Sequence, residues 1–291
     1  MTHPKSTERS GEPSVDLAAI TGPLLTLRVV EALQAARNSG LDRVDCSLDL
    51  DRSATSVGIG EIQWHWKNQQ FPYMANCKDR TIYHWTSNTF APVSRYSGRL
   101  IKLVPTEWGA PTFEIDGIKM LPTAQVSPYE DAKRKVGLIE PRGKIVLDTC
   151  GGLGYFAAWC LQGDASQVLS FEKSADVIWL RGINPWSPTQ SDRLILTHGD
   201  IATAIALLDT GCVDAILHDP PRFGIAGELY SQSFYDQLAR VLKRRGRLFH
   251  YTGSPNKLTS GRDVPMEVTK RLRQAGFTTE LNGDGVMAQK K

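Results

Sequence analysis

The sequence predicts an α/β protein in which a small β-rich unit precedes a sheet of seven strands, six parallel and the last antiparallel. Strand and helix patterns alternate from Gly143 onward, as in right-handed β-α-β units. The last two strand patterns are separated only by Asn282–Gly285, an Asn-Gly-Asp-Gly stretch typical of a hairpin. Between Val44 and Leu121, short runs of β-rich composition prevail. We therefore expect a flexible arm (1–15), a domain with one helix and many strands (16–125) and a larger domain (126–291).

The first expected element is a helix from Pro23 to Arg37, whose apolar residues recur at helical spacing and which Ser39-Gly40 ends. Strands follow at 44–50, 61–66, 81–85, 99–104, 112–115 and 118–121. Four of the seven tryptophans lie here, and we favour core packing over an aromatic ligand face. The larger domain should have strands at 145–149, 168–172, 194–197, 215–218, 247–251, 277–281 and 286–289. Its helices should span 155–162, 175–182, 201–208, 231–243 and 264–274.

Composition and charge exclude several classes of protein. Hydrophobic residues (41%) and charged residues (22%) match globular averages, and no apolar run approaches the roughly 20 residues of a membrane span. The first twenty residues lack the apolar segment of a secretory signal, which predicts a cytoplasmic protein. Five cysteines without a C-x-x-C pair favour neither disulfides nor a metal site. With 34 basic and 31 acidic residues, no DNA partner is expected, while the oligomeric state, a homodimer included, stays open.

A glycine-rich loop follows the first strand of the larger domain, with the sequence Asp148-Thr149-Cys150-Gly151-Gly152-Leu153-Gly154-Tyr155. Glycines at such a turn let a cofactor approach the backbone, and the N–H groups at the helix start bind polar groups. An acid before the glycines would repel a pyrophosphate, but Asp148 suits the cationic amino-acid end of S-adenosylmethionine. Cys150 stands where methyltransferases commonly have Gly or Ala, and a small buried side chain is its favoured interpretation.

Two further acids follow neighbouring strands. Glu172 ends the second strand, where a carboxylate can accept both hydroxyls of a ribose. Asp200 follows the third strand, and binding an adenine amino group or capping the next helix explains it equally well. The predicted cofactor-binding residues are Asp148, Cys150, Gly152, Gly154, Tyr155, Glu172, Lys173, Asp200, Ile201 and Asp219.

The fourth strand ends in His218-Asp219-Pro220-Pro221-Arg222-Phe223. Two prolines stiffen this turn and hold Asp219 in place, as amino methyltransferases use a D-P-P-aromatic loop to hold a target nitrogen. Because Arg222 replaces the stacking aromatic residue, a flipped adenine is a poor substrate guess. Some ribosomal RNA cytosine methyltransferases also have D-P-P, a basic residue and Phe, so an RNA substrate stays open, although no cysteine nucleophile follows Cys212.

Three histidines, His198, His218 and His250, end adjacent predicted strands. A general base at His218 or His250 is one interpretation, and hydrogen-bonded core histidines are its strongest rival. Their spacing fits no metal motif. The predicted catalytic residues are Asp219, His218 and Tyr235, and the predicted substrate-binding residues are Pro220, Arg222, Phe223, Glu228, Tyr230, His250 and Tyr251.

The stretches D-T-C-x-G-L-G-Y, H-D-P-P-R-F, G-E-L-Y-S and L-F-H-Y-T-G together resemble the predicted class I S-adenosylmethionine-dependent methyltransferases found mainly in archaea. The resemblance covers about residues 115–280 and implies a Rossmann-like methyltransferase sheet and S-adenosylmethionine as the cofactor, but it does not identify the acceptor. We expect methyl transfer to a nitrogen of a small molecule or RNA.

Two other functions stay open. The segment around Glu228-Leu229-Tyr230 and Phe234-Tyr235 is similar to polyamine synthases such as spermidine synthase, which would imply aminopropyl transfer from decarboxylated S-adenosylmethionine. Their G-G-G-D-G-G loop is absent here. A non-catalytic RNA- or protein-binding adaptor is the third option, and the intact Asp219-Pro220-Pro221 loop counts against it.

Overall fold

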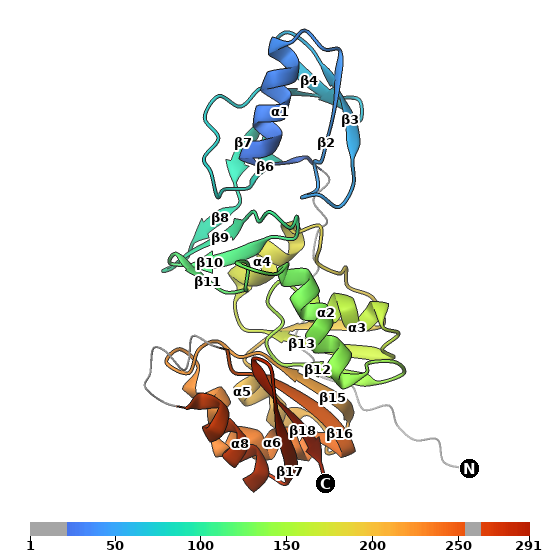
Figure 1. The fold of residues 1–291 in the computed structure, drawn as a ribbon, viewed down its shortest axis with the longest axis vertical. Coiled ribbons are helices and arrows are strands. Elements are labelled where there is room, and N and C mark those ends of the chain that lie inside the picture. Colours follow the sequence, from blue (N-terminus) through green and yellow to red (C-terminus); the bar gives the residue numbers. More distant parts are fainter. Residues whose placement is uncertain (1–21, 254–262) are drawn as a thin grey trace, which may run out of the picture.

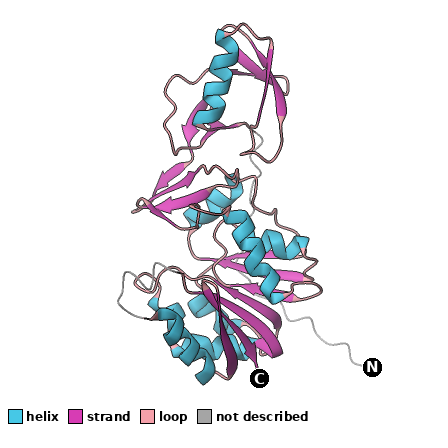
Figure 2. Ribbon diagram, in the orientation of Figure 1, coloured by secondary structure: helices cyan, strands magenta, loops and turns pink. Residues whose placement is uncertain are grey.

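The computed structural model describes residues 22–253 and 263–291, so the arm expected at 1–15 lies outside the described residues. The molecule is elongated, with its N-terminal helix and short strands at one end and a large sheet at the other (Figure 1). Figure 2 shows how helices are confined to one element near the N-terminus and to the layers around this sheet. None of the helices in the described residues is long and apolar enough to cross a membrane.

The large sheet confirms the predicted fold class. Its strands are β12 (Ile145–Asp148), β13 (Gln167–Glu172), β14 (Leu194–His198), β15 (Val213–His218), β16 (Leu242–Tyr251), β17 (Phe277–Asn282) and β18 (Gly285–Lys290). Their spatial order is β14-β13-β12-β15-β16-β18-β17. The first five strands are parallel, and β18 is antiparallel to both β16 and β17. The reversed strand therefore lies inside the sheet, inserted between β16 and β17, and the hairpin turn lies where the Asn-Gly-Asp-Gly stretch predicts it.

Helices cover both faces of this sheet. One layer contains α2 (Pro128–Ile139), α3 (Tyr155–Gln162) and α4 (Ala175–Ile183), and the other contains α5 (Ile201–Ala204), η1 (Ile205–Leu207), η2 (Gly227–Tyr230), α6 (Gln232–Val241) and α8 (Val264–Gln274). Because strand side chains alternate, Val146 packs in the first layer and Leu147 in the second. Two expectations need correction: α2 was not predicted, and α6 ends at Val241, because Leu242 already begins β16.

From residue 22 onward, the N-terminal part contains three small sheets, with more strands than expected. They are formed by β1 (Leu24–Leu25), β6 (Tyr83–Thr86) and β7 (Thr89–Pro92); by β2 (Arg43–Cys46), β3 (Thr55–Ile59), β4 (Gln63–Trp66) and β5 (Gln69–Pro72); and by β8 (Ser94–Tyr96), β9 (Leu100–Val104), β10 (Thr112–Ile115) and β11 (Ile118–Lys119). Helix α1 (Leu27–Asn38) begins four residues later than predicted, because Leu24 and Leu25 pair with β6 instead.

The tryptophans of this part mainly fill its core, as predicted. Trp64 is fully buried and stacks on Phe71, with ring centroids 4.6 Å apart. Trp85 is partly buried against the same cluster, whereas Trp108 is 41% exposed. The favoured interpretation therefore holds for Trp64 and Trp85 but not for Trp108.

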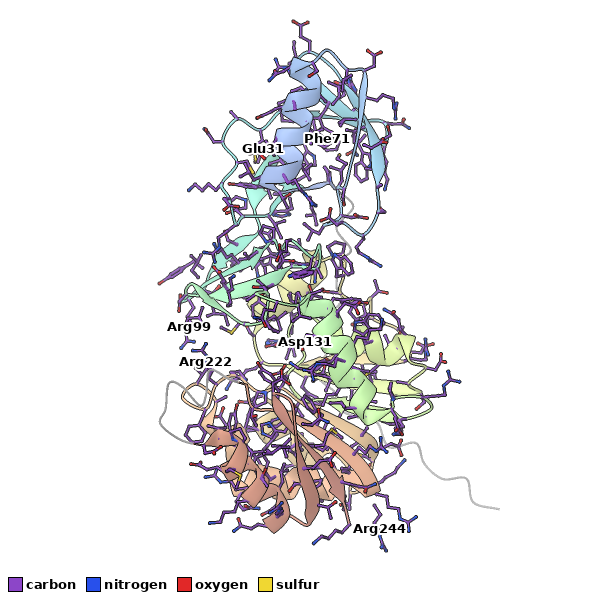
Figure 3. The ribbon with its side chains drawn as sticks, viewed as in Figure 1. Glu31, Phe71, Arg99, Asp131, Arg222 and Arg244 are labelled. Atoms are coloured by element: carbon purple, nitrogen blue, oxygen red, sulfur yellow. The ribbon has the colours of Figure 1, made fainter. Side chains whose placement is uncertain are left out.

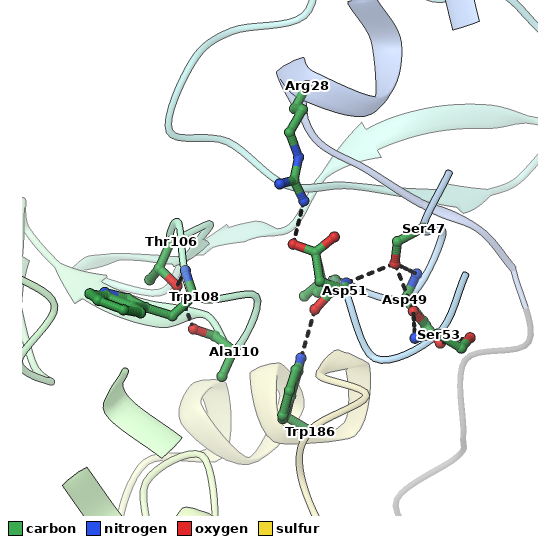
Figure 4. A network of polar contacts seen from close by, with 10 residues as sticks. Arg28, Ser47, Asp49, Asp51, Ser53, Thr106, Trp108, Ala110 and Trp186 are labelled. Atoms are coloured by element: carbon green, nitrogen blue, oxygen red, sulfur yellow. Dashed lines mark hydrogen bonds and ion pairs between the residues drawn. The ribbon is translucent and has the colours of Figure 1, made fainter. Parts of the chain in front are cut away.

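Polar contacts join the N-terminal part to the segment that follows helix α4 (Figure 4). The indole N–H of Trp186, which follows α4, donates to the carbonyl of Leu50 (2.8 Å), next to the ion pair between Arg28 and Asp51. Phe113 of β10 packs into the core cluster of α2, α3 and α4. The β10–β11 hairpin is thereby held over the carboxyl end of the sheet, where it forms one wall of the site.

Candidate functional site

A cavity of about 570 Å³ opens at the carboxyl ends of the central strands. The chain runs from β12 outward to β13 and β14 and then returns to β15 on the other side, so loops diverge at this switch point and leave a crevice. Its wall is formed by the loops after β12, β13, β15 and β16, by α2 and by the β10–β11 hairpin. Asp131 on α2 and Arg222 on the loop after β15 mark two of these sides (Figure 3).

The glycine loop forms the floor of the cavity. The Gly151 N–H donates to the carbonyl of Phe171 (2.7 Å) and the Gly152 N–H to Glu172 Oε2 (2.9 Å), which ties the loop to the end of β13. Gly152 has φ +49°, and the nearest atom to a Cβ added there would be in Phe113, 3.9 Å away. A ligand can therefore approach the Gly152 backbone closely.

Gly154 has a different structural role. It is the N-cap of α3 at φ +82°, and a Cβ there would lie 2.6 Å from Cζ of the buried Arg181. We expect Gly154→Ala to lower the free energy of unfolding by about 3 kcal/mol, from left-handed strain plus overpacking. Gly143→Ala is the matched control, because its φ of +69° is similar but nothing lies within 4 Å of its Cβ position. Urea unfolding should show a loss of only about 1 kcal/mol there, and equal losses would contradict the packing argument.

Glu172, at the end of β13, is among the residues that line the cavity. Oε2 accepts from Gly152 N–H and Oε1 accepts from Ser174 N–H (2.8 Å), so the side chain is fixed in one orientation. Burial raises the pKa of Glu172, and these backbone N–H groups partly offset that effect. Each oxygen keeps a lone pair for a hydroxyl donor in the cavity.

Asp148 lies beneath the glycine loop and does not contribute to the described cavity wall. It is 1% exposed, and its Oδ2 accepts from Ser170 Oγ (2.9 Å). Arg181 of α4 donates to the same Ser170 oxygen (3.3 Å), and its charge favours the ionised carboxylate. Burial nevertheless raises the pKa of Asp148 to about 6. The residue predicted to bind the cofactor tail is therefore buried near Arg181, to which Ser170 links it, and this arginine was not predicted from the sequence.

Asp219 also lines the cavity and follows β15, which lies on the other side of β12 from the strand of Glu172. Its side chain is 22% exposed, and Lys135 Nζ lies 3.8 Å from its Oδ2. Burial raises the pKa of Asp219 to about 6, with Lys135 opposing this shift and the carboxylates of Asp131 and Asp284 adding to it. Asp219 is therefore a carboxylate that can exchange a proton near neutral pH.

A charged network surrounds Asp219. Lys135 Nζ binds Asp131 Oδ2 (2.7 Å), and Arg134 bridges Asp131 (3.1 Å) and Asp284 (2.9 Å). These residues come from α2 and from the β17–β18 turn, two elements far apart in sequence. Asp131, Lys135 and Asp284 were not predicted from the sequence. The four-residue spacing of an acid and a base on one helix was the only available signal for the first two.

The side chain of Tyr230 supports the Asp219-Pro220-Pro221 loop through a hydrogen bond. Pro220, Pro221 and Arg222 line the cavity, and the Tyr230 hydroxyl donates to the carbonyl of Pro221 (3.1 Å). Tyr230 is 1% exposed, and the ring of Phe223 packs against it with centroids 5.5 Å apart. Tyr230, Phe223 and Glu228 lie outside the described cavity wall, so this geometry makes Tyr230 a support of the loop.

The two histidines proposed as bases lie in the core. His218 is fully buried; its Nε2 donates to the carbonyl of Leu229 (3.1 Å), so its Nδ1 accepts from Thr149 Oγ1 (2.7 Å). His250 is buried likewise; its Nδ1 donates to the carbonyl of Tyr251 (2.9 Å), and its Nε2 accepts from the Tyr235 hydroxyl (3.0 Å). Burial lowers the pKa of both, to about 4 for His250. This arrangement favours hydrogen-bonded core histidines over a general base, and it places Tyr235 in the same core.

The remaining predicted residues lie in the cavity wall, at the surface or in the core. Cys150, Tyr155 and Tyr251 line the cavity, and burial raises the pKa of the Cys150 thiol. Asp200 caps α5 by accepting from Ala202 N–H (2.9 Å) and pairs with Lys173 (2.6 Å), which supports its capping interpretation. Ile201 is buried in the second helical layer. Within residues 22–253 and 263–291, no group of three or more His, Cys, Asp or Glu is placed to hold a metal ion.

Comparisons with known proteins agree with this fold. No family model matches the chain. Over 180 residues it is 44% identical to the uncharacterized protein MJ1233 of Methanocaldococcus jannaschii, a match that covers 60% of this chain and 61% of that protein. A spermidine synthase solved with the transition-state analogue AdoDATO is 18% identical with a TM-score of 0.55, covering 70% of this chain and 77% of the synthase. An S-adenosylmethionine-dependent methyltransferase from Mesorhizobium loti is 16% identical with a TM-score of 0.43, covering 55% and 96%. The chain thus shares the fold of spermidine synthase.

Proposed function

We propose that this protein is an S-adenosylmethionine-dependent methyltransferase that binds its cofactor in the cavity at the carboxyl end of the sheet. The position of Glu172 is the observation that carries the proposal. Its carboxylate is fixed by Gly152 N–H and Ser174 N–H at the end of β13, where it can accept the two ribose hydroxyls. The cavity volume of about 570 Å³ lies in the range that holds a ligand of this size.

The chain's own residues then align the acceptor. Bound S-adenosylmethionine supplies a methyl group on a sulfonium centre, which a nucleophile displaces in line. The two prolines after Asp219 fix the direction of its carboxylate, and the Tyr230 hydroxyl holds the loop through Pro221. Asp219 can accept a hydrogen bond, and then a proton, from a nitrogen nucleophile. The acceptor we propose is a nitrogen of a small molecule or of RNA.

Calorimetry tests the cofactor assignment. We expect the wild-type protein to bind S-adenosylmethionine and S-adenosylhomocysteine but not NAD. Glu172→Gln should weaken both by roughly 10- to 100-fold, because an amide replaces a charged acceptor. Glu61→Gln, an exposed change in the N-terminal part, is the control and should leave both affinities unchanged. Binding of NAD without either sulfur-containing ligand would overturn the proposal.

Aminopropyl transfer is the second candidate function. Three carboxylates, Asp131, Asp219 and Asp284, lie around the acceptor end of the cavity and suit a cationic amine. The co-product separates the two reactions: methyl transfer leaves S-adenosylhomocysteine, whereas aminopropyl transfer leaves 5′-methylthioadenosine. Supplying each donor with small-molecule and RNA fractions of a cell extract, and detecting the co-product by mass spectrometry, decides between them. We expect S-adenosylhomocysteine.

A further inference from the structure

Lys135 is a buried cation in the cavity wall. It lies on α2 with a relative exposure of 2%, and its Nζ stands 3.7 Å from the ring centroid of Tyr251 and 3.8 Å from Asp219 Oδ2. The other cationic side chains of the described wall, Lys119 and Arg222, are exposed. Among the described residues of the cavity wall, Lys135 is therefore the one buried cation. Burying a charged group is costly unless the charge is well paired.

The pairing of Lys135 is incomplete. An ammonium group has three N–H donors. Among the described residues, Asp131 Oδ2 at 2.7 Å is the acceptor within hydrogen-bond distance, because the 3.8 Å to Asp219 is too long for a hydrogen bond. The Tyr251 ring contributes a cation–π contact but is not a full hydrogen-bond acceptor. Lys135 lines the cavity and thus has donor capacity that these partners do not use.

The place of Lys135 along the cavity indicates what it binds. Glu172 ends β13, on one side of β12, while Asp219 follows β15, on the other side, and α2 packs over β15 and β16. If the ribose binds at Glu172, the sulfonium would lie across the glycine loop near Asp219, and the amino-acid tail would lie near Lys135 on α2. Asp148, which the sequence suggested for this tail, is buried beneath the loop.

We propose that Lys135 binds the carboxylate of the donor's amino-acid tail and thereby selects intact S-adenosylmethionine over its decarboxylated form. This inference rests on the proposed function. The ammonium group is common to both donors, so the carboxylates around the cavity do not distinguish them. The tail carboxylate is present only in the intact donor, and it supplies the charged acceptor that Lys135 lacks. With the decarboxylated donor, Lys135 would face a cationic ligand without compensation.

Calorimetry of the full-length protein with three probes tests the selection: S-adenosylmethionine, decarboxylated S-adenosylmethionine, and 5′-methylthioadenosine, which has no amino-acid tail. Wild type should bind the intact donor roughly 10- to 100-fold more tightly than the decarboxylated one, and Lys135→Met should abolish this preference while changing the affinity for 5′-methylthioadenosine by no more than about twofold. Lys135→Arg keeps the charge and should keep most of the preference.

Lys133→Met is the matched control on the same helix, because Lys133 is exposed and lies outside the cavity wall, with Glu130 (3.5 Å) and the Trp159 ring (4.5 Å) as its contacts. Lys135→Met leaves Asp131 paired with Arg134, so the variant is expected to fold, and a thermal melt checks this. A wild-type preference for the decarboxylated donor, or an equal loss for all three probes in Lys135→Met, would overturn the role of Lys135 alone. Absence of binding by every probe to the wild type would instead overturn the proposed function, and this inference with it.

Discussion

Replacing Asp219 with asparagine is expected to lower the rate of methyl transfer by roughly 100- to 1000-fold while changing the affinity for S-adenosylmethionine by no more than about threefold. The amide side chain would keep the size of the carboxylate but could not accept a proton from the acceptor nitrogen. The loop would still be fixed by the prolines after position 219 and by the hydrogen bond from the Tyr230 hydroxyl. The proposed cofactor site at the glycine loop and Glu172 should therefore be undisturbed.

The measurement is release of S-adenosylhomocysteine with the acceptor-containing fraction of a cell extract. Asp164→Asn is the matched control, because Asp164 is 65% exposed and lies outside the cavity wall. We expect the control to keep the full rate. Unchanged turnover in Asp219→Asn would refute the role of this carboxylate.

The pH dependence of Asp219 gives a second readout. Burial raises the folded-state pKa of Asp219 to about 6, above its ordinary value of 3.8. Its base form is therefore lost below about pH 6, and the wild-type transfer rate should fall there with a limb that Asp219→Asn lacks. The effect on stability has the opposite direction. Because the folded state holds this proton more tightly, the stability that protonated Asp219 contributes is lost as pH rises through about 6. Urea unfolding of both proteins between pH 4 and 8 measures this difference without any acceptor.

The large sheet could be predicted from the sequence because its strands are buried apolar runs separated by glycine, proline and acidic turns. The helices α3 and α8 have the predicted bounds. Helix α2 was missed because its buried face includes Asp131 and Lys135, so its apolar residues alone make a weak helical pattern. Ser127 and Pro128 were the available start signal, since Ser127 accepts from Tyr129 N–H and Glu130 N–H.

The short N-terminal strands were harder to predict. Strands β4 and β5 are joined at Lys67-Asn68, and β6 and β7 at Ser87-Asn88, all four residues with positive φ. Such two-residue turns are most recognisable when glycine is present, as at Asp116-Gly117 between β10 and β11, where both strands were expected. Without glycine, strands of four residues leave little periodicity to detect.

In the candidate site, too, some features could be predicted from the sequence and others could not. That Glu172 and Asp219 reach the cavity follows from their place at the ends of parallel strands. Whether an acid at a strand end faces the ligand or the core depends on partners that are distant in sequence. Asp148 turns inward because Arg181, thirty-three residues away on α4, is buried beside it, and His218 is held in the core by Leu229. The sequence shows an arginine among the apolar residues of α4, but it does not show that this arginine lies beside Asp148.

The buried Arg181 is therefore expected to contribute strongly to the stability of the fold. Arg181→Met is expected to lower the free energy of unfolding by about 3 to 5 kcal/mol at pH 8, because it leaves the Asp148 carboxylate buried without its counter-charge. Arg142→Met is the control: Arg142 is 86% exposed and 3.5 Å from Asp164, so its removal should change stability by less than about 1 kcal/mol. Urea unfolding of the two variants measures both values.

A double variant and a change of pH separate charge from packing. In Arg181→Met the pKa of Asp148 should rise further above 6, so the loss of stability at pH 8 should shrink as the pH falls and Asp148 becomes protonated. Adding Asp148→Asn removes the unpaired charge and should recover most of the loss at pH 8. A deficit that is equal at pH 5 and pH 8, and that the double variant does not relieve, would show that Arg181 acts beneath Gly154 as packing alone.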